Sequence, residues 1–246
     1  MLHYQPQVTD TGRLLGFEVL LRWQHPQYGL MPPAEFISVA EDTGLIIPIG
    51  MWAVQSACER LVQWAANPQT EHLTLSVNVS ARQFRHPMFV EQTLDVVRRT
   101  DVNPSRLRME LTESLLVDDL NAVIQKMKVL KAAGLSFSLD DFGTGYSSLS
   151  YLRRLPLDEL KIDHSFFRNV LTAETDAAIV RTIVVLAQSL NLDLIAEGVE
   201  DERQRAFLAE HGCHAYQGFL FSAPLDEQQL TAYLQHHLLV TEGMAG

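Results

Sequence analysis

The segment LRMELTESLLVDDLNAVIQKMKVLKAAGLSFSLD, residues 107–140, contains one complete unit of the pattern that decides the fold. Its first part, Leu107–Leu111, is a short apolar segment with the length of a strand. Apolar side chains then recur at helical spacing through Asn121–Ala133, and Gly134 follows as a predicted C-cap. A second strand, Leu135–Leu139, comes next. A strand, a helix and a strand in this order predict two parallel strands joined by a helix.

The same alternation of short apolar strands and amphipathic helices extends in both directions from this unit. The predicted strands are Leu2–Val8, Gly16–Leu21, Leu73–Val79, Leu107–Leu111, Leu135–Leu139, Glu159–Ile162, Leu192–Ala196 and Ala215–Phe221. The predicted helices are Pro33–Glu41, Gly50–Ala66, Pro87–Arg99, Asn121–Ala133, Ser147–Arg154, Asp176–Leu190, Glu202–His211 and Asp226–His236. This order predicts a parallel sheet covered by helices.

Two architectures fit such a sheet, an open doubly wound sheet and a closed (β/α)8 barrel. A barrel of this type takes ~250 residues, and the chain has 246. No linker rich in Gly, Ser or Pro divides residues 1–246. No GxGxxG motif follows the first strand, which disfavours a dinucleotide-binding sheet. We therefore expect a single α/β domain with the TIM-barrel architecture.

Composition and charge limit the possible functions. The chain is 47% hydrophobic and 20% charged, as in ordinary soluble proteins. Its net charge of -11 argues against unspecific binding of nucleic-acid polymers, which requires a basic surface. The two cysteines, Cys58 and Cys213, form no CxxC pair, and the start lacks the regions of a signal peptide. The most apolar helix, Ile179–Leu190, is too short to cross a bilayer, so we expect a cytoplasmic domain without membrane contact.

Polar side chains stand near the C-terminal ends of seven predicted strands. They are Glu18, Asn78, Glu110, the pair Asp140 and Asp141, Lys161 with Asp163, Glu197 with Glu200 beyond it, and Gln217. In a barrel these strand ends all meet at one mouth, where the active sites of such barrels lie. The carboxylates gathered there repel one another, so either some are protonated or a cation lies among them.

Metal is the interpretation that the residue types favour. Carboxylates with one amide, Asn78, and no Cys or His suit hard cations such as Mg²⁺, Mn²⁺ or Ca²⁺. The adjacent Asp140 and Asp141 suggest two metals with one bridging carboxylate, an arrangement typical of phosphoryl-transfer hydrolases. Lys161 would supply a positive donor for developing charge. The turn FGTGYSS, residues 142–148, is a candidate phosphate-binding or lid segment.

Each of these residues also has a simpler explanation. The alternatives are a turn cap at Asp140, an outward Glu18, a helix cap at Asn78, a solvated Lys161 and a solvated Glu110–Glu113 pair. Asp163 and Glu200 fit a supporting role better than direct metal binding. The joint placement of acids and amides at successive strand ends, rather than any single residue, favours the metal site.

The motifs at these strand ends resemble those of a known family. They are FEVLLRW (17–23), SVNVS (76–80), ELTES (110–114), DDFGTGYSSL (140–149), LKID (160–163), AEGVE (196–200) and QGFLFSAP (217–224). Together they resemble the EAL domain, a family that hydrolyses the bacterial second messenger cyclic di-GMP. The resemblance extends from Tyr4 to the helix after Pro224. The name-giving triplet is Glu18-Val19-Leu20 here, and Val19 replaces the usual Ala. Because neighbouring strand residues face opposite ways, we expect little effect on the chemistry.

The resemblance implies a modified (β/α)8 barrel with one antiparallel strand, and it implies roles for individual residues. The implied ligands are Glu18, Asn78, Glu110 and Asp140 for one metal, and Asp140, Asp141 and Glu197 for a second. The implied catalytic residues are Glu18, Lys161, which contacts the attacking water, Glu197 and Gln217, which supports the site. The implied substrate contacts are Gln5, Leu20, Arg22, which binds a phosphate, Asp163 and Pro224. Loop and supporting positions are Glu113, Gly143, Thr144, Gly145, Ser147 and Glu200.

The family's reaction is hydrolysis of one phosphodiester bond to linear pGpG, with two Mg²⁺ or Mn²⁺ ions per site and Ca²⁺ expected to inhibit. We expect in-line attack by a metal-bridging hydroxide, with Glu197 or Lys161 handling the proton. The resemblance also implies a homodimer and an upstream sensor or GGDEF domain in a longer parent protein, which could itself be membrane-anchored. Two other hypotheses stay open: a receptor that binds cyclic di-GMP without turnover, and a lyase or aldolase that uses Lys161 as a Schiff base.

Overall fold

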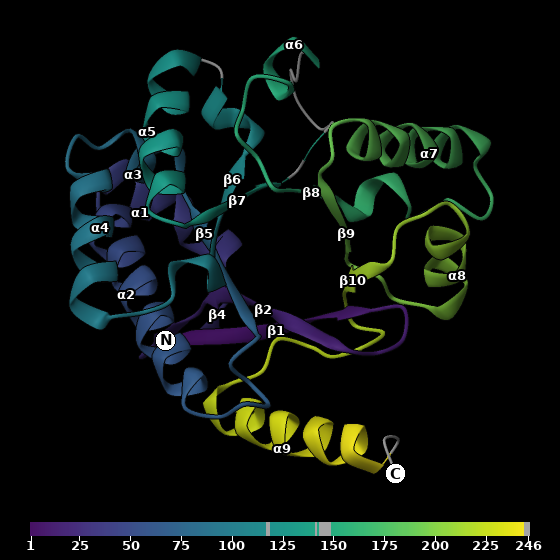
Figure 1. Cartoon of the computed structure of the whole chain (residues 1–246), viewed down its shortest axis with the longest axis horizontal. Helices are drawn as coiled ribbons and strands as arrows, with labels where there is room; N and C mark the ends of the chain where they lie inside the picture. Colours follow the sequence, from purple (N-terminus) through teal and green to yellow (C-terminus); the bar gives the residue numbers. More distant parts are fainter. Residues whose placement is uncertain (117–118, 141, 143–148, 244–246) are drawn as a thin grey trace.

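The computed structural model describes residues 1–116, 119–140, 142 and 149–243. Among these residues, eight strands close into a barrel in the order β1-β10-β9-β8-β7-β6-β5-β2 (Figure 1). The strands are β1 Leu2–Thr9, β2 Leu14–Leu21, β5 Thr74–Val79, β6 Leu107–Thr112, β7 Ser136–Asp140, β8 Glu159–Ile162, β9 Asp193–Glu197 and β10 Ala215–Gln217. β1 is antiparallel to both β2 and β10, and the other pairs are parallel. The predicted TIM-type barrel with one antiparallel strand is confirmed.

Helices surround the barrel on its outer side (Figure 1). They are α1 Ile37–Thr43, α2 Ile46–Ala65, α3 Ala81–Arg85, α4 Phe89–Thr100, α5 Leu120–Ala132, α6 Leu149–Leu152, α7 Glu174–Ser189, α8 Glu202–Glu210 and α9 Glu227–Gly243. Short 3-10 helices cover Pro33–Glu35, Pro104–Arg106, Glu113–Leu116 and His164–Phe166. Among the described helices, no single one has the length and apolar character of a membrane span. Only α1 and α2 taken together do, and they are bent by 117° where they meet.

The strands divide their side chains between two environments. Successive side chains on a strand face opposite sides, so one set lies under the helices and the other inside the barrel. The first set is apolar and belongs to the core, for example Val77, Met109 and Leu139. The second set includes the buried polar residues Ser76 and Ser138. The helices are therefore held by an apolar layer, and the barrel interior is left to small and polar groups.

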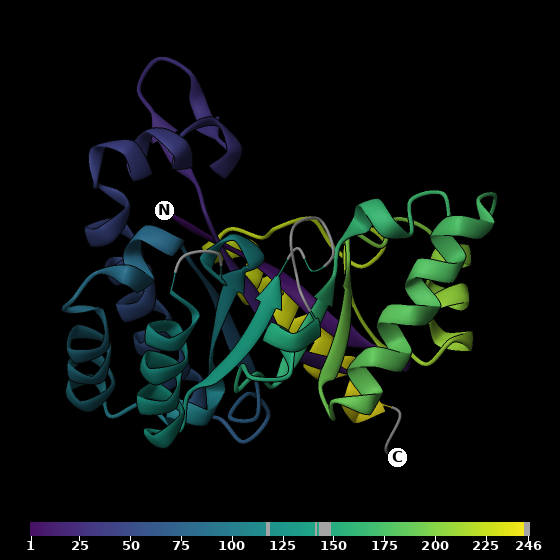
Figure 2. The same cartoon turned by 90° about the horizontal axis from the view of Figure 1, so that it is seen from above.

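The structure differs from the sequence prediction at β3 (Trp23–His25), β4 (Gly29–Met31) and the end of β10, and the short helix α3 was not predicted either. Strands β3 and β4 form a separate hairpin that projects from the barrel beside α1 (Figure 2). Each has three residues, too few to show a period. β10 ends at Gln217 rather than at Phe221, because the backbone turns at Gly218. A Cβ at Gly218 would lie 2.2 Å from the carbonyl oxygen of Val199, so only glycine fits this turn.

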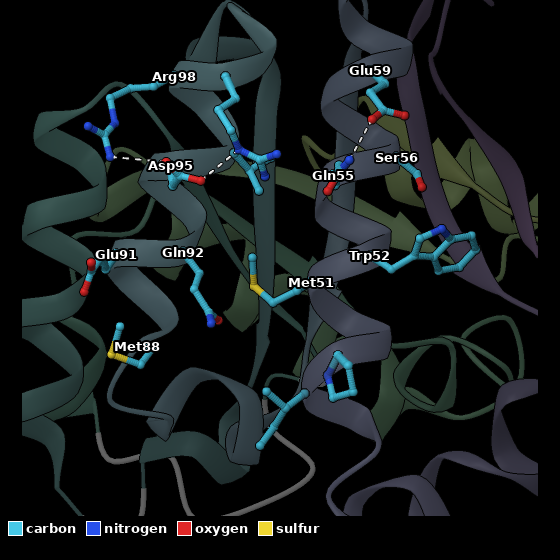
Figure 3. Close-up of a pocket in the computed structure, with 14 residues that line it drawn as sticks. Met51, Trp52, Gln55, Ser56, Glu59, Met88, Glu91, Gln92, Asp95 and Arg98 are labelled. Carbon is cyan, nitrogen blue, oxygen red and sulfur yellow. Dashed lines mark hydrogen bonds and ion pairs between the residues drawn. The ribbon is translucent and has the colours of Figure 1, made fainter.

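A groove of about 680 Å³ runs between α2 and α4 on the outside of the barrel (Figure 3). Met51 of α2 and Gln92 of α4 point toward each other across it. At one end, Asp95 forms ion pairs with Arg98 and Arg99. The groove lies on the helical layer, so it is separate from the polar interior of the barrel.

Candidate metal centre

Lys161 lies at the centre of the polar residues that the strands bring together. Its side chain, on β8, has no solvent exposure. Its Nζ lies 2.6 Å from Glu110 Oε2 and 3.4 Å from Glu18 Oε2, and it forms a third ion pair with Glu197. The three glutamates come from β6, β2 and β9. One oxygen from each lies within 4.8 Å of the others. Three carboxylates from three strands thus converge on a single ammonium.

The register of the strands accounts for this convergence. Asn78 on β5 is the partner of Glu110 on β6, and Thr112 on β6 is the partner of Asp140 on β7. Asp140 is the last residue of β7, so it lies at the same mouth as the glutamates. Its negative charge acts on Lys161. The described acids of the site come from β2, β6, β7 and β9; β6 and β7 are adjacent, and the closed barrel brings the ends of β2 and β9 to the same mouth.

Glu18 is held in place by two amides as well as by Lys161. The side-chain nitrogens of Asn78 and Gln217 each donate a hydrogen bond to one of its carboxylate oxygens. Burial opposes the charge of Glu18, but the Lys161 ammonium and the two amide hydrogen bonds outweigh it. The pKa of Glu18 therefore lies below its ordinary value. Glu18 is an ionised, immobilised carboxylate.

A second amide layer supports Gln217. Its Nε2 also donates to Gln5 Oε1 at 3.2 Å, and Gln7 Nε2 donates to Gln217 Oε1 at 3.0 Å. Sequence reasoning identified Gln5 and Gln217 but missed Gln7. The signal was present, because residues two apart on a strand share a face, and Gln5 and Gln7 are two apart.

The pKa of Glu110 is shifted in the opposite direction from that of Glu18. Burial and the charges of Glu18 and Asp140 raise the pKa of Glu110 well above its ordinary value, although Lys161 opposes them. Burial alone would lower the pKa of Lys161. The negative charges of Asp140, Glu110 and Glu18 outweigh this effect and raise the pKa of Lys161. An ammonium held this firmly cannot act as a Schiff-base nucleophile, which must be neutral. The lyase hypothesis is therefore not supported.

The donor set fits hard divalent cations. Within the described residues, four carboxylates act on the positive charge of Lys161, and the amide of Asn78 contacts one of them, Glu18. Glu110 Oε1 is buried, and no hydrogen-bond partner for it occurs in the described part of the chain. Carboxylate and amide oxygens in this number are the ligands that Mg²⁺ and Mn²⁺ prefer. The residues present could hold such ions.

Comparison with known proteins bears directly on this site. The family model described as "EAL domain" matches residues 1–224.

The chain belongs to the EAL domain family.

Several relatives of this EAL domain have named activities. MucR of Pseudomonas aeruginosa, a bifunctional diguanylate cyclase/cyclic di-GMP phosphodiesterase, is 45% identical over 233 residues, which cover 94% of this chain and 34% of that protein. PdeR of Escherichia coli, a cyclic di-GMP phosphodiesterase, is 37% identical over 238 residues, which cover 97% of this chain and 36% of that protein. This EAL domain thus spans about a third of the length of these curated relatives.

A solved structure shares the fold closely. The structure titled "PaMucR Phosphodiesterase, c-di-GMP complex" has a TM-score of 0.90 and 45% sequence identity. The match covers 94% of this chain and 93% of that chain. The barrel of this EAL domain is therefore the family's barrel along nearly its whole length.

A cavity of about 470 Å³ in the EAL domain opens beside Glu18. Among the predicted site residues, Glu18, Leu20 and Asn78 line it. Pro33 and Glu41, from the segment that carries α1, line another part of its wall. Two candidate metal ligands, Glu18 and Asn78, therefore share one cavity with apolar groups.

The other predicted substrate residues lie around the same mouth. Arg22 follows β2, and its side chain donates a hydrogen bond to the Leu21 carbonyl at 2.7 Å. It also interacts electrostatically with Glu18. Asp163 follows β8 and caps a 3-10 turn by accepting from the Ser165 N–H at 3.0 Å. The Pro224 carbonyl lies 3.4 Å from Nδ1 of a histidine on β1. Their roles toward substrate stay predictions.

The supporting positions differ in exposure. Glu113 is buried at the start of the turn after β6, whereas Glu200, beyond β9, is exposed. The remaining predicted residues, Asp141, Gly143, Thr144, Gly145 and Ser147, lie outside the described residues.

The simpler explanations for Glu18, Asn78, Lys161 and the Glu110–Glu113 pair do not hold. Glu18 and Lys161 are buried rather than solvated, and so are Glu110 and Glu113. The helix after β5 is capped by Ser80, whose hydroxyl accepts from the Gln83 N–H at 3.1 Å. Asn78 therefore remains available for its contact with the site.

Proposed function

We propose that this EAL domain hydrolyses cyclic di-GMP to linear pGpG. The observation that carries the proposal is the burial of Lys161 among Glu18, Glu110 and Glu197 in a chain of this family. The relatives MucR and PdeR are named as cyclic di-GMP phosphodiesterases, which supports the same substrate here.

Each residue contributes a distinct part of the chemistry. Two Mg²⁺ or Mn²⁺ ions, held by Glu18, Asn78, Glu110, Asp140, Asp141 and Glu197, would polarise the phosphate and lower the pKa of a water molecule. Gln217 orients Glu18 through its amide hydrogen bond. Because three carboxylates contact its Nζ, Lys161 keeps its proton and donates to the developing negative charge. Glu197, only part-buried, is then the group we assign to accept the proton of the attacking water.

The mouth of the barrel supplies the groups for substrate binding. We assign a phosphate contact to Arg22, whose guanidinium is part-buried beside Glu18. Leu20 lines the cavity, and we assign further substrate contacts to Gln5, Asp163 and Pro224. We assign supporting roles to Glu113, Glu200, Gly143, Thr144, Gly145 and Ser147.

The domain is proposed to work within a larger assembly. MucR carries a second named activity, and the oxygen sensor protein DosP of Escherichia coli is 39% identical over 235 residues that make up 29% of its length. We propose a cytoplasmic homodimer regulated by an upstream sensor or GGDEF domain. Light scattering of the purified domain tests the dimer, and a mass of one chain at micromolar concentration would contradict it.

The activity is tested by incubating the purified domain with cyclic di-GMP and resolving the products by chromatography. We expect pGpG as the first product with Mg²⁺ or Mn²⁺, and no turnover in excess EDTA. Ca²⁺ should compete and inhibit, because its looser geometry suits the transition state less well. Binding of cyclic di-GMP without any pGpG, in the presence of Mn²⁺, would identify a receptor instead and overturn the proposal.

A further inference from the structure

A second hollow lies at the opposite end of the barrel from the metal centre. Its volume is about 550 Å³. It is lined at the N-terminal ends of the parallel strands, for example by Thr74 of β5, Arg108 of β6 and Glu159 of β8. In barrels of this type that end usually serves stability alone. Here it contains a cavity within the range of volumes that hold small ligands.

The hollow gathers positive charge in an acidic protein. Its cationic and titratable lining is Arg13, His72, Arg106, Arg108 and His214, against the acids Glu159 and Asp193. Arg108 pairs with Glu159, and His214 lies 3.2 Å from Asp10. Neither Arg13 nor Arg106 has a carboxylate within ion-pair distance in the described part of the chain. Two guanidinium groups without acidic partners therefore line one cavity of a chain whose net charge is -11.

Unsatisfied polar atoms line the same cavity. The Nε atoms of Arg106 and Arg108 and the Oε1 atom of Glu159 are buried, and no hydrogen-bond partner for them occurs among the described residues. Buried donors and acceptors are normally paired, so such atoms are the ones a ligand would engage. Two are donors and one is an acceptor, which suits a ligand that carries both an anion and an N–H group.

Apolar side chains also line the hollow. They are Leu15, Leu192, Leu194 and Ile195, which share the wall with the neutral polar residues Gln7, Thr74 and Gln188. A wall that combines apolar side chains, guanidinium groups and a carboxylate suits a flat ring that bears a phosphate at one end and an N–H edge at the other.

We propose that this hollow binds a nucleoside monophosphate. The phosphate lies on Arg13 and Arg106, the ring packs on Leu192 and Leu194, and the N–H edge of the base donates to Glu159. The residues assigned to the nucleotide lie outside the metal centre, although Gln7 lines the hollow and also donates to Gln217 of that centre. The proposal does not depend on the proposed phosphodiesterase activity.

The proposal is tested by calorimetric titration of the purified domain with GMP in EDTA, where the metal-free acidic mouth repels phosphates. We expect one saturable site, and at least about tenfold weaker binding of guanosine, of ribose 5-phosphate and of inorganic phosphate, since each lacks one of the recognised groups. No saturation below several millimolar GMP would overturn the proposal, and so would equal affinity for inorganic phosphate.

Variants locate the site. Arg13→Gln with Arg106→Gln should weaken GMP binding at least about tenfold, whereas Arg181→Gln on the exposed face of α7 should leave it unchanged. Arg22→Gln, at the other mouth, should also leave GMP affinity unchanged. Wild-type affinity in the double variant, or loss of binding in Arg22→Gln, would place GMP elsewhere and contradict the proposal. Thermal melting separates loss of contact from loss of fold. Because both replaced side chains are at least partly exposed, we expect the double variant to melt like the wild type. The Arg106→Lys variant, which keeps the positive charge, is the conservative control.

Discussion

Lys161 is the residue on which the charge balance of the site depends. Replacing it by methionine removes the ammonium and leaves Glu18, Glu110 and Glu197 facing one another. We expect Lys161→Met to lower the free energy of unfolding of the metal-free domain by about 3–5 kcal/mol, the usual effect of breaking a buried ion pair. Chemical denaturation in EDTA measures this change.

Adding a divalent cation provides an internal control for the Lys161→Met variant. Because a divalent cation can replace the missing positive charge, Mg²⁺ should restore more stability to Lys161→Met than it adds to the wild type. Lys128→Met, on the exposed face of α5, should have no such effect. A Lys161→Met protein as stable as the wild type in EDTA would show that the carboxylates do not need this ammonium.

Gln7 tests whether the amide layer positions Glu18. It reaches the site only through Gln217, to which it donates at 3.0 Å. Because supporting partners of metal ligands usually contribute 10–100-fold to activity, we expect Gln7→Leu to lower kcat about tenfold with little change in KM. Gln7→Glu, which can no longer donate from this position at neutral pH, should behave like Gln7→Leu. Steady-state kinetics decide, and unchanged kcat in both variants would remove Gln7 from the site.

At the scale of the elements, the sequence predicted most of what has a regular period. The segment 107–140 folds as strand, helix and strand, because its apolar residues change from strand to helix spacing and back. The β3–β4 hairpin was not predicted, because each of its strands has only three residues, too few to show a period. The convergence on Lys161 could be expected from the strand ends, but not the individual contacts, since these depend on the stagger of the closed barrel.

Gly16 shows how closely the strands approach in this barrel. It pairs with Thr74 across β2 and β5, and a Cβ at Gly16 would lie 2.2 Å from the Thr74 carbonyl oxygen. We expect Gly16→Ala to destabilise the domain by at least about 1–3 kcal/mol, as other overpacking changes do. Denaturant unfolding measures this. Gly12→Ala is the control. A Cβ at Gly12 would have no atom within 4 Å, so this variant should lose only about 1–2 kcal/mol, which is what a left-handed backbone costs a residue with a side chain. If Gly16→Ala is as stable as the wild type, β2 and β5 are not packed as described.

At the scale of the whole molecule, both cysteines report on the integrity of the barrel. Cys58 of α2 and Cys213 before β10 are buried, and burial raises the pKa of each thiol to about 12. Since thiolates are the reactive form, neither should react with a thiol reagent at pH 8 while the domain is folded. Both should react once guanidinium unfolds it. Rapid reaction of one thiol in the native domain would show that its part of the core opens readily.

The central claim is that the glutamates around Lys161 form the catalytic centre of a cyclic di-GMP phosphodiesterase. The most direct measurement compares pGpG formation by the wild type, by Glu18→Gln and by Glu202→Gln, with Mn²⁺ and saturating cyclic di-GMP. Glu18 lies in the site, whereas Glu202 is an exposed residue of α8. We expect turnover by the wild type and by Glu202→Gln at equal rates, and a loss of at least about a thousandfold in Glu18→Gln, because the variant loses a charged metal ligand. Turnover by Glu18→Gln at the wild-type rate would contradict the account.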